Sequence, residues 1–179
     1  IIRAGLGVTI STTLIAYCIA LFIGLIVGLG RVSESVFWRN LSTIYVEIIR
    51  GVPLLVLIFF IALVLIPAIT NLLSNLGVYL TSVGWQGIGG VLAAIENRSV
   101  SMNSRAIISL AITYGAFSAE IFRAGIQSIN KGQMEAARSQ GMSHWQAMRF
   151  VILPQAIRNV LPALGNDLIS MLKDSSLVS

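Results

Sequence analysis

Four stretches of the chain are predominantly apolar, as membrane-spanning helices are. The first runs from Gly7 to Leu29 without a charged residue. A second runs from about Leu54 to Ile69, with a helix that we expect to begin earlier, near Ser42, and a third runs from Ala106 to about Gln127. A fourth covers Gln155 to Leu172. Since about 20 predominantly apolar residues span a bilayer, the pattern predicts an all-α membrane protein, a polytopic helical bundle of about four spans.

The fourth stretch differs from the others because Pro162, Asn166 and Asp167 interrupt it. A carboxylate at the centre of a bilayer costs about 3 kcal/mol or more. We therefore expect this helix to be kinked and packed against protein rather than lipid. Asn166 and Asp167 would then either line a water-filled cavity that attracts an ammonium group, or make hydrogen bonds to another helix.

Basic residues between the apolar stretches predict the orientation of the chain. One arginine cluster lies within residues 31–50, after the first stretch, and another basic cluster follows the third stretch. Positive loops favour the cytoplasm, so an even number of crossings separates the two clusters. The second and third stretches are those crossings. This places the N-terminus outside, an outer loop with a short helix at about 70–104, and a cytoplasmic loop at about 128–156.

Composition excludes several classes of protein. Of the 179 residues, 56% are hydrophobic and only 11% are charged, and the mean hydropathy is +0.87. Soluble domains have about one quarter charged residues, so a disordered chain, a nucleic-acid-binding arm and most soluble enzymes are excluded. The net charge of +5 belongs to the cytoplasmic loops and says nothing about a substrate. Cys18 and His144 are the sole cysteine and histidine, and no metal site is expected.

The cytoplasmic loop at about 128–156 predicts two short helices joined by a glycine corner. Asn130 precedes the first helix as a cap, with Gln133 three residues later in the position of a capping box. Gly141 sits where that helix ends, because only glycine enters the left-handed conformation cheaply. The segment Ser143–Gln146 has a second capping-box spacing, and we expect the second helix to end before the proline that closes the loop.

Small residues make this corner a candidate docking surface. Ala136, Ala137 and Gly141 would let the backbone of another protein approach closely. The alternative is a helix that lies on the membrane surface. Its apolar face would be weak, because Met134 and Met142 add little to a lipid-binding stripe. The pattern therefore favours docking of a partner.

Three motifs carry a family resemblance. The first is Glu135-Ala136-Ala137, followed after three residues by Gly141 and then by Val151-Ile152-Leu153-Pro154. It resembles the EAA loop of permease subunits in binding-protein-dependent ABC importers, with Val151 in place of the usual isoleucine. Two further motifs resemble the polar amino-acid branch of that family: Tyr45-Val46-Glu47 through Arg50-Gly51-Val52-Pro53-Leu54-Leu55, and Lys173-Asp174-Ser175-Ser176-Leu177. In these, Val52 and Ser175 each replace a usual threonine.

The resemblance covers about residues 5–179 and implies an ABC importer transmembrane domain over the whole chain, 1–179. The family usually has five spans, and the last of them is missing from this sequence. Such a permease moves a polar or charged amino acid across the bacterial inner membrane by alternating access. The carried-over coupling surface would consist of Glu135, Ala136, Ala137, Gly141, Leu153 and Pro154.

The resemblance also implies partners. They are a dimer of ATP-binding subunits, a second identical or homologous permease subunit, and an extracytoplasmic amino-acid-binding protein or fused binding domain. ATP and Mg would be bound by the ATP-binding subunit. In this chain no glycine-rich run is followed by Lys-Ser or Lys-Thr, so we expect it to bind no cofactor and to be a transport subunit, not an enzyme.

A second candidate site is the substrate path. Glu47 and Arg50 lie three apart on one helical face near the membrane, and Gly51 and Pro53 allow the helix to bend there. The charged pair either borders the path, together with the polar pair of the fourth stretch, or anchors the second span as an interfacial ion pair.

Glu120 and Arg123 have the same i, i+3 spacing in the third stretch. Because Arg123 can extend to the interface, we interpret this pair as structural.

Two interpretations remain open beside an importer. A secondary transporter driven by an ion gradient would instead use paired buried charges and would show internal repeats, which we do not find. A membrane scaffold without transport activity is the other class, and either alternative leaves the EAA-like loop without a role.

Overall fold

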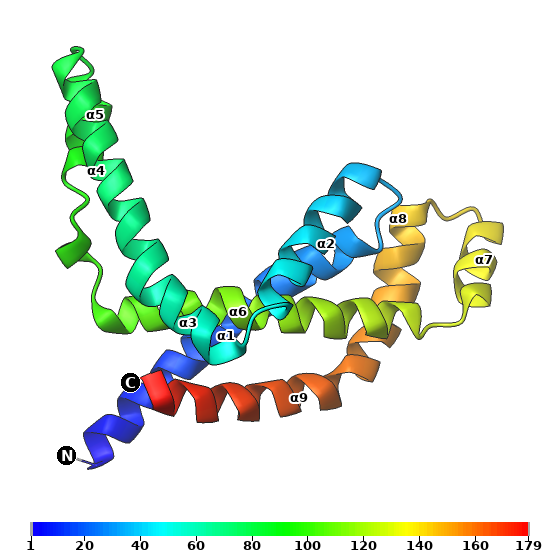
Figure 1. The fold of residues 1–179 in the computed structure, drawn as a ribbon. Helices are drawn as coiled ribbons and strands as arrows, with labels where there is room; N and C mark the ends of the chain where they lie inside the picture. The colour runs from blue at the N-terminus through cyan, green and yellow to red at the C-terminus, as the bar shows by residue number, and fades with distance from the viewer. Residues whose placement is uncertain (1, 179) are drawn as a thin grey trace.

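Every regular element in the described part of the chain is a helix, as the sequence predicts (Figure 1). The structure is a computed structural model that describes residues 2–178, and the side chains of residues 6–176. In chain order the main helices are α1 (Ile2–Arg31), α2 (Val36–Arg50), α3 (Leu54–Phe60), α4 (Ile66–Ser82), α5 (Gln86–Ala93), α6 (Met102–Gln127), α7 (Lys131–Ser139), α8 (His144–Ala147) and α9 (Leu153–Val178). Two π-helical turns, η1 (Ile61–Leu65) and η3 (Met148–Ile152), continue α3 into α4 and α8 into α9. A short 3-10 turn, η2 (Asn97–Ser99), precedes α6.

Three helical segments in the described residues are long and apolar enough to cross a membrane. They are Leu6–Arg31, Leu54–Ser82 and Met102–Gln127, and each contains one of the predicted apolar stretches. The 26 residues of α6 extend over about 39 Å, which exceeds the roughly 30 Å hydrocarbon core of a bilayer. The predicted fourth span, now α9, is as long as α6 but does not reach the same apolarity. A fourth crossing therefore stays a prediction.

The second span begins at Leu54 as predicted, but the predicted start of its helix and the predicted end of the span are wrong. Its helix does not begin near Ser42, because α2 ends at Arg50 and α3 starts only at Leu54. Pro53 between them lacks an N–H and disfavours a helical conformation at the residue before it. Nor does the span end at Ile69, since α4 continues to Ser82. The region 70–104 thus holds the end of a long helix as well as the expected short one, α5.

Helices α4 and α5 form a hairpin that projects from the rest of the molecule (Figure 1). Gly84 closes α4 with a positive φ of 99°. The two helices touch at glycines: a Cβ added to Gly77 would lie 2.1 Å from the backbone nitrogen of Ala93. The hydroxyl of Ser74 donates to the carbonyl of Ala93 at 3.3 Å. Polar and small residues in this stretch therefore join two helices instead of marking a loop.

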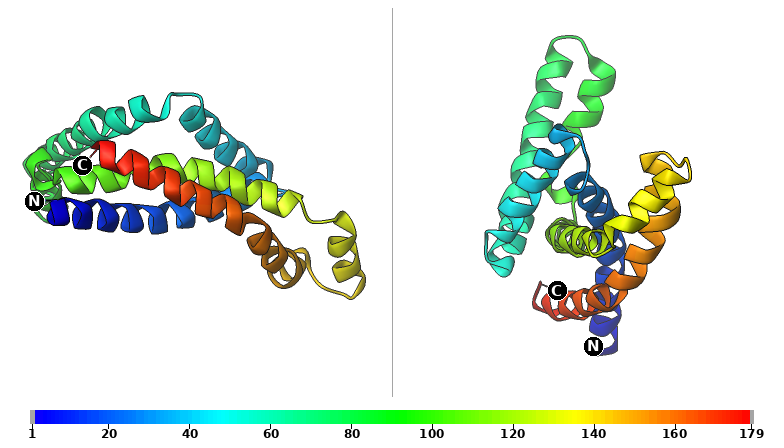
Figure 2. Two further views of the ribbon diagram at one scale, coloured as in Figure 1. Left: turned by 90° about the horizontal axis from the view of Figure 1, so that it is seen from below. Right: turned by 90° about the vertical axis from the view of Figure 1, so that its right-hand side faces the viewer.

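Helices α1 and α6 pack side by side and run in the same direction (Figure 2). Their close approach depends on small residues of α1, as is common between membrane helices. A Cβ added to Gly24 would lie 2.6 Å from the Cβ of Ser118, and one added to Gly28 would lie 2.9 Å from the Cβ of Phe122. These glycines set the spacing of the two central helices.

We expect Gly24→Val to push α1 away from α6. Its Cβ would meet α6 at the Cβ of Ser118 and, at 3.0 Å, at the backbone nitrogen of Ala119. Overpacking of this kind costs about 1–3 kcal/mol, which lowers the melting temperature by several degrees. The control is Gly7→Val in the same helix, where an added Cβ meets nothing within 4 Å. Thermal unfolding in detergent should separate the two variants, and equal melting temperatures would contradict the packing.

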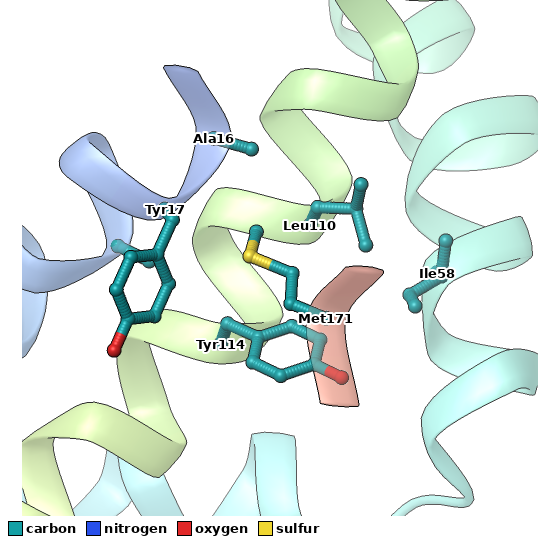
Figure 3. Packing of buried hydrophobic residues seen from close by; sticks show 7 residues of the cluster. Ala16, Tyr17, Ile58, Leu110, Tyr114 and Met171 are labelled. Atoms are coloured by element: carbon teal, nitrogen blue, oxygen red, sulfur yellow. The ribbon is translucent and has the colours of Figure 1, made fainter. Parts of the chain in front are cut away.

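Helix α9 is packed against protein, as expected for a helix with a carboxylate near its centre. Met171 of α9 is fully buried and reaches in among side chains of α1, α3 and α6 (Figure 3). The apolar cluster around it consists of Ala16, Tyr17, Ala20, Ile58, Leu110, Tyr114 and Met171. Pro162 lies inside the helix, where it removes a backbone hydrogen bond. The first turns of α9 and the remainder run in different directions (Figure 1).

Candidate functional site

Helices α7 and α8 and the corner between them protrude at one end of the bundle (Figure 1). We call residues 130–147 the α7–α8 segment. The two chain termini lie at the opposite end (Figure 2). The segment is anchored beneath by an apolar cluster of Ile126, Met148, Ile152 and Ala156, against which Met134 of α7 packs. This cluster joins α7 to α6 and to the start of α9.

The beginning of α7 is fixed by a side-chain cap. The side-chain oxygen of Asn130 accepts a hydrogen bond from the N–H of Gly132 at 2.8 Å, which confirms the predicted cap. Gln133 does not complete a capping box. Its side-chain oxygen instead accepts from the amide of Gln155 in α9 at 3.4 Å, and the first turn of α7 is thereby tied to α9.

The corner at Gly141 is a Schellman motif, in which a left-handed residue closes the helix. Gly141 has a φ of 83°, as the sequence predicts. Its N–H donates to the carbonyl of Arg138 at 2.9 Å, and the N–H of Met142 donates to the carbonyl of Ala137 at 3.3 Å. A Cβ on Gly141 would meet nothing within 4 Å. The backbone conformation, not crowding within the chain, is what requires glycine here, and the corner is open to an approaching partner.

Helix α8 begins with the predicted capping box. The hydroxyl of Ser143 accepts from the N–H of Gln146 at 3.2 Å, and the side-chain oxygen of Gln146 accepts from the N–H of Ser143 at 2.9 Å. The prediction that this helix ends before Pro154 is wrong. The chain continues through the π-helical turn η3, which directly precedes α9 and its Pro154, and such π-bulges accompany breaks in the regular hydrogen bonding of a helix.

The six residues predicted to couple this chain to an ATPase do not share one surface. Glu135, Ala136 and Gly141 are exposed along the outer side of the segment, and Pro154 is exposed on α9. Ala137 is buried on the inner side of α7. Leu153 packs on the apolar cluster beneath the segment. Three residues of the motif are thus available for direct contact in the segment, while two support it from within.

A cluster of charged side chains joins α1, α2 and α6. The carboxylate of Glu120 accepts hydrogen bonds from Arg31 of α1 and from Arg123, and the guanidinium of Arg50 in α2 lies 3.8 Å away. Arg50 also lies over the ring of Phe117, 5.6 Å from its centroid. We call these four charged residues the Glu120 cluster, in which one carboxylate is the ion-pair partner of three guanidinium groups. Glu120 therefore connects three helices rather than one pair on α6.

Of the two alternatives for Glu47 and Arg50, the one in which they form an interfacial ion pair is wrong. Within residues 6–176, no ion pair includes Glu47, whose side chain is exposed, and Arg50 is directed to Glu120 instead. Gly51 ends α2 and donates its N–H to the carbonyl of Glu47 at 2.9 Å, while Pro53 begins α3. A carboxylate inside an apolar helix was the signal for the Glu120 cluster, since such a group needs cationic partners.

The polar residues of α9 do not form one site, because some contact α6 and others are exposed. Asp167 accepts a hydrogen bond from the hydroxyl of Ser118 in α6 at 3.1 Å. Asn166 is exposed and does not share this site. Asp174, one helical heptad beyond Asp167, accepts from the hydroxyl of Tyr114. The structure thus shows Asp167 in an interhelical hydrogen bond, and the Tyr114–Asp174 contact is one that sequence reasoning missed.

Residues 2–178 contain no group of three or more His, Cys, Asp or Glu side chains arranged to hold a metal ion. The candidate site consists of an exposed rigid corner at one end of the bundle and of charged groups between the long helices.

The comparison with solved structures agrees with this arrangement. The crystal structure of an amino acid ABC transporter with histidines is similar, with a TM-score of 0.72 and 38% sequence identity over 98% of this chain and 69% of that chain. The long apolar helices therefore belong to a membrane bundle of known architecture.

Curated relatives are similar across nearly the whole chain. The probable amino-acid ABC transporter permease protein YckA of Bacillus subtilis is 34% identical over 98% of this chain and 65% of its own length. The arginine transport system permease protein ArgU of Corynebacterium glutamicum is 36% identical over 95% of this chain and 49% of its own length. The L-cystine transport system permease protein TcyB of Bacillus subtilis is 34% identical over 100% of this chain and 64% of its own length. The chain spans about half to two thirds of the length of these relatives.

The family defined as the inner membrane component of binding-protein-dependent transport systems matches residues 20–179. This match includes the last part of α1 and all of α2 to α8, with the α7–α8 segment, as well as α9. The chain therefore belongs to the family of binding-protein-dependent transport system inner membrane components, and it is a helical protein that crosses the membrane several times.

Proposed function

We propose that this chain is part of the permease subunit of an ATP-driven importer that moves a polar or charged amino acid inward by alternating access. The family and the printed names of the relatives support a permease for amino acids. The observation that carries the proposal is the exposed glycine corner of the α7–α8 segment with its EAA motif. A separate ATP-binding subunit would bind ATP and Mg and hydrolyse the nucleotide.

The proposed orientation has the α7–α8 segment in the cytoplasm. Its support is that the turn after α1 and the α7–α8 segment lie at one end of the bundle, while the N-terminus and the start of α6 lie at the other (Figure 2). Arginine clusters belong on the cytoplasmic side, and both basic segments are at the same end. The α4–α5 hairpin then faces outward, toward a binding protein or a fused binding domain.

The α7–α8 segment is built to transmit motion. Caps at Asn130 and Ser143 and the Schellman motif at Gly141 fix its shape. The apolar cluster beneath it joins α6 and α9, and α8 continues without a break into α9. Closure of an ATPase dimer would therefore move the segment as a unit and turn the long helices with it. The second permease subunit would complete the path between the two bundles.

Charged groups between the long helices are candidates for the substrate path, because ionisable residues in membrane spans are costly and face a cavity or a partner. The Glu120 cluster has three guanidinium groups for one carboxylate. Asp167 is partly exposed despite its contact with Ser118, so it could attract the ammonium group of an amino acid. Glu47, Arg50, Gly51, Pro53 and Asn166 stay predictions for this path.

Asp167→Asn tests whether the charge or the hydrogen bond matters. An asparagine oxygen can still accept from Ser118, but the negative charge is lost. We expect normal expression and a loss of uptake of about tenfold or more, since a hydrogen bond to a charged group contributes about 1.5–3 kcal/mol. The control Ser118→Ala removes the hydrogen bond and keeps the charge, and it should transport nearly as the natural chain does. Wild-type uptake and substrate profile in Asp167→Asn would leave Asp167 with a structural role.

Transport by the full-length permease in proteoliposomes tests the proposed function. Uptake of a polar amino acid should require ATP, the ATP-binding subunit and the binding protein together. Uptake driven by an ion gradient without the ATP-binding subunit would support a secondary transporter instead. No uptake with the complete set of components would favour a scaffold.

A further inference from the structure

A basic cavity of about 590 Å³ lies where α1, α2 and the α7–α8 segment meet. Four basic or titratable side chains from four elements line it: Arg31, Arg39, Lys131 and His144. Aliphatic side chains form much of the remaining wall, namely Val32, Ile126, Ile129, Met134, Met148 and Ile152. Among residues with described side chains, no acidic residue lines this cavity. Its wall therefore combines positive charge with apolar surface.

Two of these side chains carry a positive charge that no ion pair among the described side chains neutralises. Arg31 is already bound within the Glu120 cluster. His144 has a carboxylate partner at the rim, with its Nδ1 atom 3.5 Å from Oε1 of Glu34. In contrast, no ion pair among the described side chains includes Arg39 or Lys131. The cavity thus presents two uncompensated positive charges, one from α2 and one from α7.

The cavity lies at the ends of two membrane-spanning helices. Arg31 is the last residue of α1, and Gln127, which also lines the cavity, is the last residue of α6. Beside it, the start of α2 exposes Phe37 and Trp38, which are 67% and 56% exposed and whose rings make an edge-to-face contact with each other. Tryptophan is favoured at membrane–water interfaces. In the proposed orientation, this position would place the cavity at the level of the lipid headgroups.

We propose that this cavity binds the headgroup of an anionic phospholipid of the cytoplasmic leaflet. Arg39 and Lys131 match the charge of its phosphate, and the aliphatic wall matches its glycerol and first methylene groups. The exposed aromatic side chains of α2 contact the acyl chains. Basic pockets between helices on the cytoplasmic side are suited to such headgroups. The inference rests on the cytoplasmic orientation proposed above.

A lipid held in this way connects two parts of the molecule. Arg39 belongs to α2, which leads into the second span, and Lys131 begins α7. One phosphate shared by both side chains would hold the α7–α8 segment against the membrane part. The fraction of anionic lipid in the membrane would then influence how firmly the segment transmits motion.

The test measures lipids retained by the complete transporter. The assembly is reconstituted in nanodiscs of phosphatidylcholine with increasing phosphatidylglycerol, and retained lipids are counted by native mass spectrometry. We expect the natural protein to retain phosphatidylglycerol preferentially. Since a cation near a membrane contributes about fivefold, Arg39→Gln with Lys131→Gln should lower the preference about 25-fold.

Matched variants control for charge and folding. Arg149→Gln with Arg158→Gln removes two exposed cations outside the cavity, and it should keep the preference. The exchange Arg39→Lys with Lys131→Arg keeps both charges and should also keep it. If the double glutamine variant fails to assemble, loss of the preference in Lys131→Gln alone supports the proposal, and its persistence there overturns it.

Three results would overturn the proposal. Equal lipid retention by the double glutamine variant and the natural protein would remove the cavity as the site. Displacement of the lipid by millimolar inorganic phosphate would assign the cavity to a soluble anion. If lipid is retained only after the ATP-binding subunit is removed, the cavity would be assigned as a contact surface for that subunit. Lipid retention is measured without transport, so a failure of the proposed transport function would be recognised separately.

Discussion

Gly141→Asp is expected to insert into the membrane normally and to abolish ATP-driven uptake. A residue other than glycine at a φ of 83° costs about 1–2 kcal/mol, which a protein of this size can tolerate. An added Cβ meets nothing within the chain, so the new side chain projects outward from the corner. It would place a charge and added bulk where the proposed ATP-binding partner docks. Uptake in proteoliposomes measures the effect, and detergent melting measures the local cost.

The chain offers a closely matched control at Gly84. This residue also has a positive φ, of 99°, and an added Cβ there also meets nothing within 4 Å. It closes α4 with the same pair of backbone hydrogen bonds, from Gly84 to Thr81 and from Trp85 to Leu80. Gly84→Asp therefore carries the same local strain at the opposite end of the bundle, and we expect it to keep most of its uptake. Wild-type uptake in Gly141→Asp would show that the corner is not the docking site.

Glu120→Gln should destabilise the protein more than the loss of any other carboxylate in the chain. It removes the negative charge that Arg31, Arg50 and Arg123 share, and leaves three guanidinium groups together. These side chains are only partly buried, with 16–42% of each exposed, so we expect less than the cost of breaking a fully buried ion pair. The loss of charged hydrogen bonds costs about 1.5–3 kcal/mol, which lowers the melting temperature by about 3–12 °C. Thermal unfolding of the solubilised protein measures this loss.

Two variants separate charge from packing in this prediction. Glu47→Gln removes an exposed carboxylate that has no ion pair among the described residues, and it should leave the melting temperature unchanged. Adding Arg123→Gln to Glu120→Gln removes one excess positive charge and should restore part of the stability. An unchanged melting temperature in Glu120→Gln would mean that the Glu120 cluster contributes nothing to holding α1, α2 and α6 together.

Local chemistry explains what the sequence could predict. The cap at Asn130, the left-handed Gly141 and the capping box at Ser143 each depend on residues within five positions, and all three occur as expected. The uncharged run of α1 likewise predicts a span from composition alone. These features follow from backbone geometry that neighbouring residues determine.

Features that depend on distant residues could not be predicted in the same way. Arg31 and Glu120 are 89 positions apart, and Arg50 reaches Glu120 from a third helix. The i, i+3 spacing rule paired Arg50 with Glu47 because it considers only residues within one helix. The length of α4 was underestimated because polar and small residues such as Ser74 and Gly77 resemble loop residues until the packing of α5 against them is known.

Cross-linking from the exposed face of α7 tests most directly whether the glycine corner contacts an ATP-binding subunit. Ala136→Cys, made in a Cys18→Ser background and labelled with a thiol-linked benzophenone, places the probe on an exposed position of the segment. Gly87→Cys in α5, where an added Cβ is unobstructed, provides the control at the other end. Photolysis of the assembled transporter should join the ATP-binding subunit to position 136 and not to position 87. Capture of that subunit at position 87 alone, or labelling of position 136 only from outside the cell, would contradict the proposed coupling site.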